Sequence, residues 1–336
     1  MATLLFSLLL AAASLLAAAQ SREAAAVNSV AWSRDASRLL TATGNGDLAL
    51  FDAETGELTQ RIDGPGAFVV FATFTPDDRQ VVAADYAGQV TVFDVATGEA
   101  IAVARGHDAE AACLAVSPNR DRFASSDKAG NVVVWSWDGE SLAIERRLDA
   151  AVGDFANQVA FDPAGRRLAT CGSASRDAGT GEVVVFDVAT GEEVTRALLP
   201  AFANAVEFSG DGEAIYVGLA NGTVRGINVS TGGPAGNPDG AGPQDLAKVR
   251  VVANDIALLL GDDGQPRETI AAGGDGLLRR ANFNGSAAWS VRADPSVCYY
   301  AALSPDGSRV ATSGNDGALR LFDAADGALI REISLP

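Results

Sequence analysis

Short apolar stretches alternate with turn residues along almost the whole chain after residue 26. Each stretch holds five to eight residues rich in Val, Leu, Ile, Ala and Phe, which suits a β-strand and is too short for an ordinary helix. The pattern recurs seven times, and one tight turn of each repeat is marked by a glycine: Gly46, Gly88, Gly130, Gly181, Gly222, Gly276 and Gly317. Asn or Asp precedes four of these glycines, which is the strongest short signal for a β-hairpin.

Two further turns complete each repeat. The downstream turn is clearest in Asp52–Glu57, Asp94–Glu99, Asp187–Glu192, Asn228–Gly233 and Asp323–Ala328. Three turns divide a repeat into four short antiparallel strands, and seven such units arranged radially form a β-propeller. We therefore predict an all-β fold over residues 20–336, a seven-bladed β-propeller of four-stranded antiparallel blades preceded by an apolar N-terminal segment.

An aromatic residue followed by Asp ends the third predicted strand of several repeats, at Phe51-Asp52, Phe93-Asp94, Phe186-Asp187 and Phe322-Asp323. The third repeat also contains a Gly-His pair, Gly106-His107. On these motifs the chain from Val27 to Pro336 resembles a WD-repeat seven-bladed propeller, with Phe in place of most of the family's Trp residues.

The resemblance implies a buried, hydrogen-bonded tetrad of His, Ser or Thr, Asp and Trp in a blade. The residues that it assigns to such structural positions are His107, Ser125, Trp135, Thr312 and Asp316. Ala129 stands at the position that we assign to the Asp of the third repeat, which predicts an incomplete network there. The seventh repeat lacks the His.

Ring closure is expected to depart from the family. Its members commonly complete the last blade with an N-terminal strand, whereas the seventh repeat here is complete through Ala328–Leu335 and the first begins at its innermost strand near Val27. We therefore expect the first and last blades to close by face packing alone and their seam to be the weak point of the ring.

The N-terminal segment 1–19 carries no charged side chain and ends in Ala17-Ala18-Ala19, which fits the cleavage rule of a secretory signal peptide. It lacks the usual positively charged start, and as a helix it would fall just short of a bilayer core. A cleaved signal, an uncleaved anchor and a helical cap all remain open. The leader favours export, whereas WD-repeat proteins are mostly cytosolic or nuclear, so the sequence leaves the compartment uncertain.

Composition removes several function classes. The formal net charge of −18 repels phosphate backbones, which argues against a nucleic-acid partner. With a single histidine and three cysteines that show no CxxC spacing, the chain offers no multi-histidine metal site and no histidine-based catalysis. We expect no catalytic residues, no cofactor and no metal, and we expect the cysteines to be buried apolar residues.

Some aromatic and polar residues have no evident role in the core. They lie four or six residues before an apolar anchor near the end of each first strand, or one residue before a hairpin turn, where WD-repeat propellers open onto the top face around the central channel. We predict that this face binds the partner through Phe68, Tyr86, Lys128, Phe155, Asn157, Phe202, Asn204 and Tyr299. The alternative is that the phenylalanines fold under and pack between blades.

These observations predict a non-catalytic scaffold, monomeric within a larger complex, that binds a protein or peptide on its top face. Contact with a membrane is expected only if residues 1–19 form an uncleaved anchor. The alternative is an exported propeller enzyme or small-ligand binder, lactonase-like or quinoprotein-like, that uses the central channel.

Overall fold

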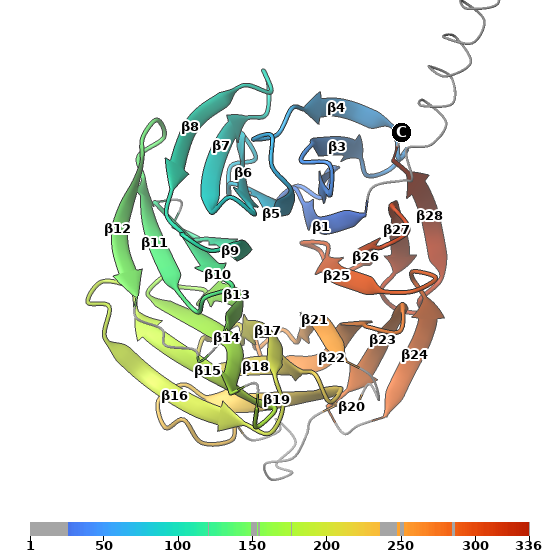
Figure 1. Ribbon diagram of the computed structural model, residues 1–336. Helices are drawn as coiled ribbons and strands as arrows, with labels where there is room; N and C mark the ends of the chain where they lie inside the picture. Colours follow the sequence, from blue (N-terminus) through green and yellow to red (C-terminus); the bar gives the residue numbers. More distant parts are fainter. Residues whose placement is uncertain are drawn as a thin grey trace, which may run out of the picture.

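The structure is a computed structural model that describes residues 26–119, 121–148, 153, 155–175, 177–235, 247–248, 252–283 and 286–335. These residues form seven four-stranded antiparallel sheets arranged around a central axis, which confirms the predicted propeller (Figure 1). The predicted leader, residues 1–19, lies outside the described residues. No helix able to span a membrane occurs in the part of the chain that the structure describes.

Each blade runs from the axis outward in chain order. The innermost strands are β1 (Val27–Trp32), β5 (Val69–Phe74), β9 (Ala111–Val116), β13 (Phe155–Phe161), β17 (Ala203–Phe208), β21 (Ala253–Leu260) and β25 (Cys298–Leu303). The second strands are β2 (Arg38–Thr43), β6 (Gln80–Asp85), β10 (Arg122–Asp127), β14 (Arg167–Ser175), β18 (Ala214–Leu219), β22 (Pro266–Gly273) and β26 (Arg309–Gly314).

The third strands are β3 (Leu48–Asp52), β7 (Gln89–Asp94), β11 (Val132–Trp137), β15 (Thr180–Asp187), β19 (Thr223–Asn228), β23 (Leu277–Asn282) and β27 (Ala318–Asp323). The outer strands are β4 (Leu58–Ile62), β8 (Ala100–Arg105), β12 (Leu142–Leu148), β16 (Glu193–Leu199), β20 (Ala247–Lys248), β24 (Ala287–Arg292) and β28 (Leu329–Ser334).

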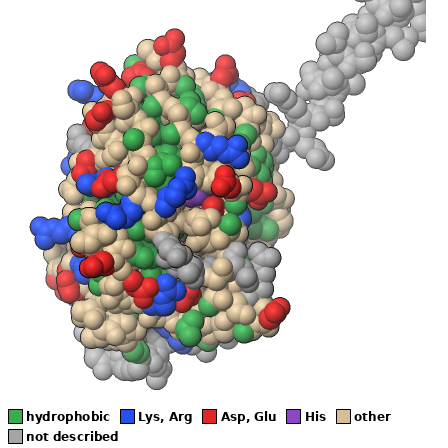
Figure 2. Space-filling view, turned by 60° about the vertical axis from the view of Figure 1, so that its left-hand side comes forward, with side chains coloured by type: hydrophobic (Ala, Val, Ile, Leu, Met, Phe, Trp, Pro, Cys, Tyr) green, Lys and Arg blue, Asp and Glu red, His purple; other side chains and the backbone are tan. Residues whose placement is uncertain are grey.

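The core lies between neighbouring blades. The second and third strands are covered on both faces, which explains why their sequences are apolar runs rather than alternating patterns. One cluster, for example, joins Val183 and Val185 of the fourth blade to Val206 and Ile215 of the fifth. The outer strands are largely exposed, and their apolar side chains mix with charged ones on the side of the molecule seen in Figure 2.

The ring closes without a strand exchanged between the first and last blades among the described residues, as expected. Instead, Trp32 of β1 donates its indole N–H to the Ala302 carbonyl oxygen at 2.9 Å. The Arg309 guanidinium lies over the Trp32 ring, 4.7 Å from its centroid. An apolar cluster that includes Phe51 and Leu321 fills the seam. Whether this seam is the weakest of the ring stays a prediction.

The turn glycine predicted for the fourth blade is wrong by two residues. Gly181 lies inside β15, opposite Ser173 of β14, and the pairing continues to Ser175 and Thr180. The turn therefore moves to a segment that includes Gly179, whose φ of 64° replaces the one predicted at Gly181. The extra residues lengthen the ladder instead of forming a surface loop, whereas the other six predicted turn glycines all have positive φ.

Candidate functional site

Every innermost strand carries a β-bulge at the same place. In β13, for example, Ala156 pairs with Gly172 and Gln158 with Cys171, so that Asn157 has no residue opposite it. A bulge re-aims the side chain of the extra residue. The seven bulged residues, one from each blade, are Asn28, Val70, Ala112, Asn157, Asn204, Asn254 and Tyr299.

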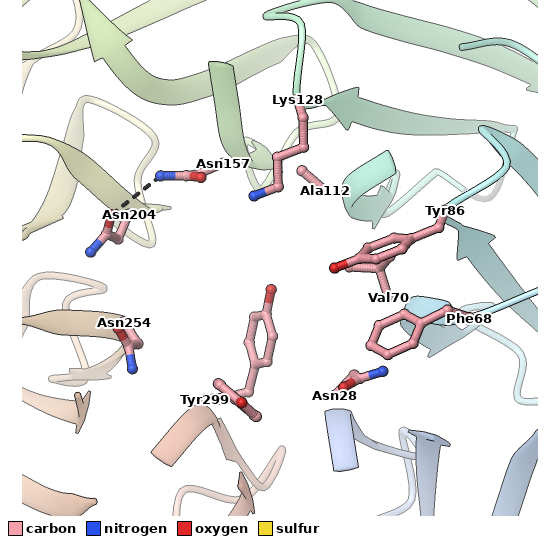
Figure 3. A pocket seen from close by; sticks show the side chains of 11 residues that line it. Asn28, Phe68, Val70, Tyr86, Ala112, Lys128, Asn157, Asn204, Asn254 and Tyr299 are labelled. Carbon is pink, nitrogen blue, oxygen red and sulfur yellow. Dashed lines mark hydrogen bonds between the residues drawn. The ribbon is translucent and has the colours of Figure 1, made fainter. Parts of the chain in front are cut away.

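All seven bulged residues line one cavity at the mouth of the central channel (Figure 3). The cavity has a volume of about 370 Å³. The other described residues of its lining are Phe68, Tyr86, Lys128 and Tyr300. The bulge is a repeated feature of the blade, so the fold itself points seven side chains toward one place.

Three asparagines from consecutive blades, Asn157, Asn204 and Asn254, form what we call the carboxamide wall. Each donates its Nδ2–H to a backbone carbonyl oxygen of the next blade: Asn157 to Ala203 at 3.0 Å, Asn204 to Ala253 at 3.1 Å and Asn254 to Cys298 at 2.9 Å. Asn28 does the same to Val69 at 2.7 Å. These amides are interblade ties as well as cavity lining.

The opposite side of the cavity is the aromatic–cationic wall, formed by Phe68, Tyr86 and Lys128. The Phe68 and Tyr86 rings stack with centroids 4.4 Å apart and 24° between their planes. The Lys128 ammonium points into the cavity in Figure 3 and lies 5.9 Å from the centroid of the Phe155 ring. Partial removal from water lowers the pKa of Lys128, although the residue as a whole is exposed.

The fold does not require large side chains where Tyr86 and Lys128 stand. Their backbone N–H groups donate to the carbonyl oxygens of Phe68 and Glu110, each two residues before a bulge. The equivalent donors in other blades are Gly44, Ala220, Gly274 and Asn315. Because the same backbone bond forms with small residues, the Tyr86 and Lys128 side chains have no evident structural reason to be there.

The Lys128 turn is held by a complete buried tetrad, so the predicted gap at Ala129 is wrong. His107 Nε2 lies 2.6 Å from Ser125 Oγ, which also accepts the Trp135 indole N–H at 2.8 Å. His107 Nδ1 lies 3.0 Å from Oδ2 of Asp127, the residue that fills the Asp position.

Asp127 also fixes the turn itself, because its Oδ1 accepts the backbone N–H groups of Ala129 and Asn131 at 2.9 and 2.8 Å. Burial alone would raise its pKa, but hydrogen bonds from His107 and Asn131 hold the pKa of Asp127 below its ordinary value.

The seventh blade has no such tetrad around its assigned residues. Thr312 Oγ1 donates to the Arg320 carbonyl oxygen at 3.4 Å, and the Asp316 carboxylate pairs with Arg320 at 2.6 Å. Buried Asp294 accepts the Asp316 N–H at 3.0 Å, so another carboxylate organises the turn.

The comparisons agree with this architecture. A model of the PQQ_2 family, described as outer membrane protein assembly factor BamB, matches residues 20–235. The chain belongs to this family. A second model, described as WD domain, G-beta repeat, matches residues 289–323, and with the fold it confirms the predicted likeness to WD-repeat propellers. A search of curated proteins found no match.

Six of the eight predicted partner-binding residues line the cavity of this BamB-family propeller: Phe68, Tyr86, Lys128, Asn157, Asn204 and Tyr299. The other two, Phe155 and Phe202, are half-buried and pack edge to face on each other with centroids 6.0 Å apart. Sequence reasoning missed Asn254, although it lies four residues before Leu258 just as Asn204 lies four before Phe208. Partner binding by any of these residues stays a prediction.

Side chains meet across the channel directly below the cavity. Phe71 of the second blade packs edge-on against Tyr300 of the seventh, with centroids 5.2 Å apart. Gln158 of the fourth blade donates to Asp255 of the sixth at 3.0 Å. Each of these four residues directly follows a bulged residue. The two residues of each pair belong to blades that are separated by one other blade. The cavity therefore has a floor made by side chains from non-adjacent blades.

Two carboxyl groups lie on the innermost strands here, Asp255 directly after a bulged residue and Glu207 three residues after one. Glu207 accepts the Leu258 N–H at 2.8 Å, and Asp255 accepts the Ala301 N–H at 3.1 Å. Removal from water, reinforced by the charge of Asp255, raises the pKa of Glu207 to about 8. Removal from water also raises the pKa of Asp255 to about 6. Among the described residues, no group of three or more His, Cys, Asp or Glu side chains could hold a metal ion.

Proposed function

We propose that this propeller is a non-catalytic docking platform whose partner, a protein or peptide, inserts into the cavity at the mouth of the channel. The observation that carries the proposal is the aromatic–cationic wall. Tyr86 and Lys128 stand where three other blades hold Gly or Ala and the seventh holds Asn315. With Phe68 they place two stacked rings and an ammonium in the cavity. Exposed aromatic residues with a basic neighbour are typical of interface centres.

The histidine and the cysteines of the chain support the non-catalytic part. Both ring nitrogens of His107, the single histidine, are engaged in the buried tetrad. All three cysteines are buried and free of disulfides, as expected, and burial raises the pKa of Cys113 to about 12. A thiol with so high a pKa is a poor nucleophile.

The family supports a role with protein partners, because the matching model is named for an assembly factor of outer membrane proteins. The alternative, a small-ligand binder or enzyme that uses the channel, is favoured by one observation. The cavity volume of about 370 Å³ falls within the range of small-molecule sites. A partner that inserts only a short segment needs no larger space.

Site-specific photo-crosslinking tests the docking proposal. A photoreactive amino acid replaces Tyr86 in the cavity, and in a matched protein it replaces Leu198, an exposed apolar residue of the outer strand β16. Each protein is irradiated in an extract of the native cell. We expect a discrete protein adduct from position 86 that is absent from position 198.

Competition sharpens the test. Excess unlabelled wild-type protein should abolish the adduct, whereas an excess of the Tyr86→Ala/Lys128→Gln variant should not. Equal adducts from both positions, or equal competition by the variant, would contradict docking at the cavity. Binding of small molecules without any protein adduct would favour the alternative function.

A further inference from the structure

We call the cavity a well, because side-chain contacts narrow the channel next to it. Phe71 packs against Tyr300 and Gln158 bonds to Asp255, and each contact joins blades that are not neighbours. A chain end suits such a well, because it needs no exit on the far side.

Lys128 gives the well a preference for negative charge. Among the described residues that line the cavity, it is the one with a formal charge, in a protein whose net charge is −18. No carboxylate of the described residues forms an ion pair with it, and the charge of Glu110 affects its pKa less than loss of water does. A partly desolvated ammonium without a paired carboxylate is stabilised by an incoming anion.

The groups around Lys128 define what else the anion should carry. The Phe68–Tyr86 stack offers an apolar surface on one side of the ammonium. On the other side, Asn157 commits its Nδ2 to Ala203 and Asn204, and its amide oxygen lies on the side facing Lys128 (Figure 3). This oxygen is oriented to accept an N–H donor.

Building on the docking function, we propose that the cavity binds the C-terminal carboxylate of a partner polypeptide whose last side chain is apolar or aromatic. Lys128 pairs with the carboxylate, Asn157 accepts the last peptide N–H, and the terminal side chain lies on the Phe68–Tyr86 stack. A chain end brings these three groups together on one residue. An internal Glu or Asp side chain brings a carboxylate alone, without an adjoining apolar side chain.

An array of hexapeptides tests the proposal directly. The peptides share a Gly/Ser body, end in Phe, Leu or Lys, and are each made with a free C-terminal carboxylate and as the C-terminal amide. A parallel set has an internal Glu and an amidated end. We expect the wild-type protein to bind the free-acid peptides ending in Phe or Leu, and amidation to weaken binding by about 10-fold or more, since a charge-assisted hydrogen bond is lost.

Matched variants separate a specific contact from a general charge effect. Lys128→Gln should weaken binding by about 10- to 100-fold. Arg34→Gln removes the same charge from an exposed turn of the first blade, outside the cavity lining, and should leave binding unchanged. Lys128→Arg, which keeps the charge, should retain most of the affinity and shows that the position tolerates substitution.

Several results would overturn the inference. These are equal binding of acids and amides, preference for the internal-Glu set, or equal loss in the Lys128→Gln and Arg34→Gln proteins. If no peptide binds but crosslinking at position 86 still captures a protein, the C-terminal assignment fails and the docking function survives. If no peptide binds and crosslinking at position 86 captures no protein, both the C-terminal assignment and the docking function are contradicted.

Discussion

The two walls of the cavity are built from equivalent positions of the same repeat but serve different ends. In the carboxamide wall, each bulged Asn ties its blade to the next, so its side chain belongs to the ring as much as to the cavity. Across the cavity the bulged positions hold Val70 and Ala112, which form no such tie. Tyr86 and Lys128 extend over them from hairpin turns.

This difference separates side chains that stabilise the propeller from side chains that its stability does not require. An amide that donates to a neighbouring blade is explained by the stability of the ring. A stacked tyrosine and a lysine at positions that hold Gly, Ala or Asn in four other blades are not explained in this way. Function is therefore best sought in the aromatic–cationic wall, and four variants test this division.

The largest loss of stability is expected when Asp127, which holds the Lys128 turn of the aromatic–cationic wall, is replaced. Asp127→Ala leaves His107 and two backbone N–H groups of the Lys128 turn without their buried acceptor. We expect it to lower the free energy of unfolding by about 3 to 5 kcal/mol in urea denaturation. Asp127→Asn, which keeps one acceptor oxygen, should lose clearly less. Equal losses in the two variants would show that the acceptor role is not what matters.

The carboxamide wall should respond in stability. The double variant Asn157→Ala/Asn204→Ala removes two interblade ties and leaves the carbonyl oxygens of Ala203 and Ala253 unpaired. We expect a loss of about 2 to 3 kcal/mol in the free energy of unfolding. Val70→Ala, which truncates a bulged residue that forms no tie, is the control and should lose less than about 1 kcal/mol. A double variant as stable as the control would show that these asparagines do not stabilise the ring.

Two carboxyl groups of the innermost strands, Glu207 and Asp255, should make stability depend on pH. Because the pKa of Glu207 is raised to about 8 in the folded protein, the folded state binds a proton more tightly than the unfolded state does. The stabilisation is complete below the ordinary Glu pKa and is lost as the pH rises through about 8. The raised pKa of Asp255 adds a loss in the same direction around pH 6.

Glu207→Gln should therefore flatten the fall in unfolding free energy between about pH 5 and pH 8, as urea denaturation at a series of pH values would show. Glu140→Gln removes a charge from an exposed turn and should leave the slope unchanged. The interpretation fails if the two variants have the same slope.

Much of the fold could be predicted because short stretches of the sequence indicate its turns and strands. Gly46, Gly88 and the other turn glycines mark hairpins through the φ that they must adopt, and the apolar runs between them have the length of strands. The fourth-blade turn was misplaced because ladder pairing between Ser175 and Thr180 depends on both strands at once. Asp127 was missed because the turn was aligned on its glycine and not on the side chain that caps it.

The cavity was predictable in part. Counting back from the first-strand anchors found most of its lining, since the spacing is the same in each blade. The bulge, which explains that spacing, is a property of strand pairing and leaves no residue signature common to Asn157, Val70 and Tyr299. The contact of Phe71 with Tyr300 joins residues that are far apart in the chain, so no local pattern reveals the floor.

The variant that should change stability least also tests the central claim most directly, namely that the aromatic–cationic wall binds the partner. Tyr86→Ala/Lys128→Gln should change the free energy of unfolding by less than about 1 kcal/mol, because neither side chain forms a hydrogen bond to another blade among the described residues. The same variant, carrying the photoreactive residue at position 70 in the cavity, should lose the protein adduct that position 70 gives in the otherwise wild-type chain. A stable variant that still forms the adduct, or a strongly destabilised one, would contradict the assignment of binding to this wall.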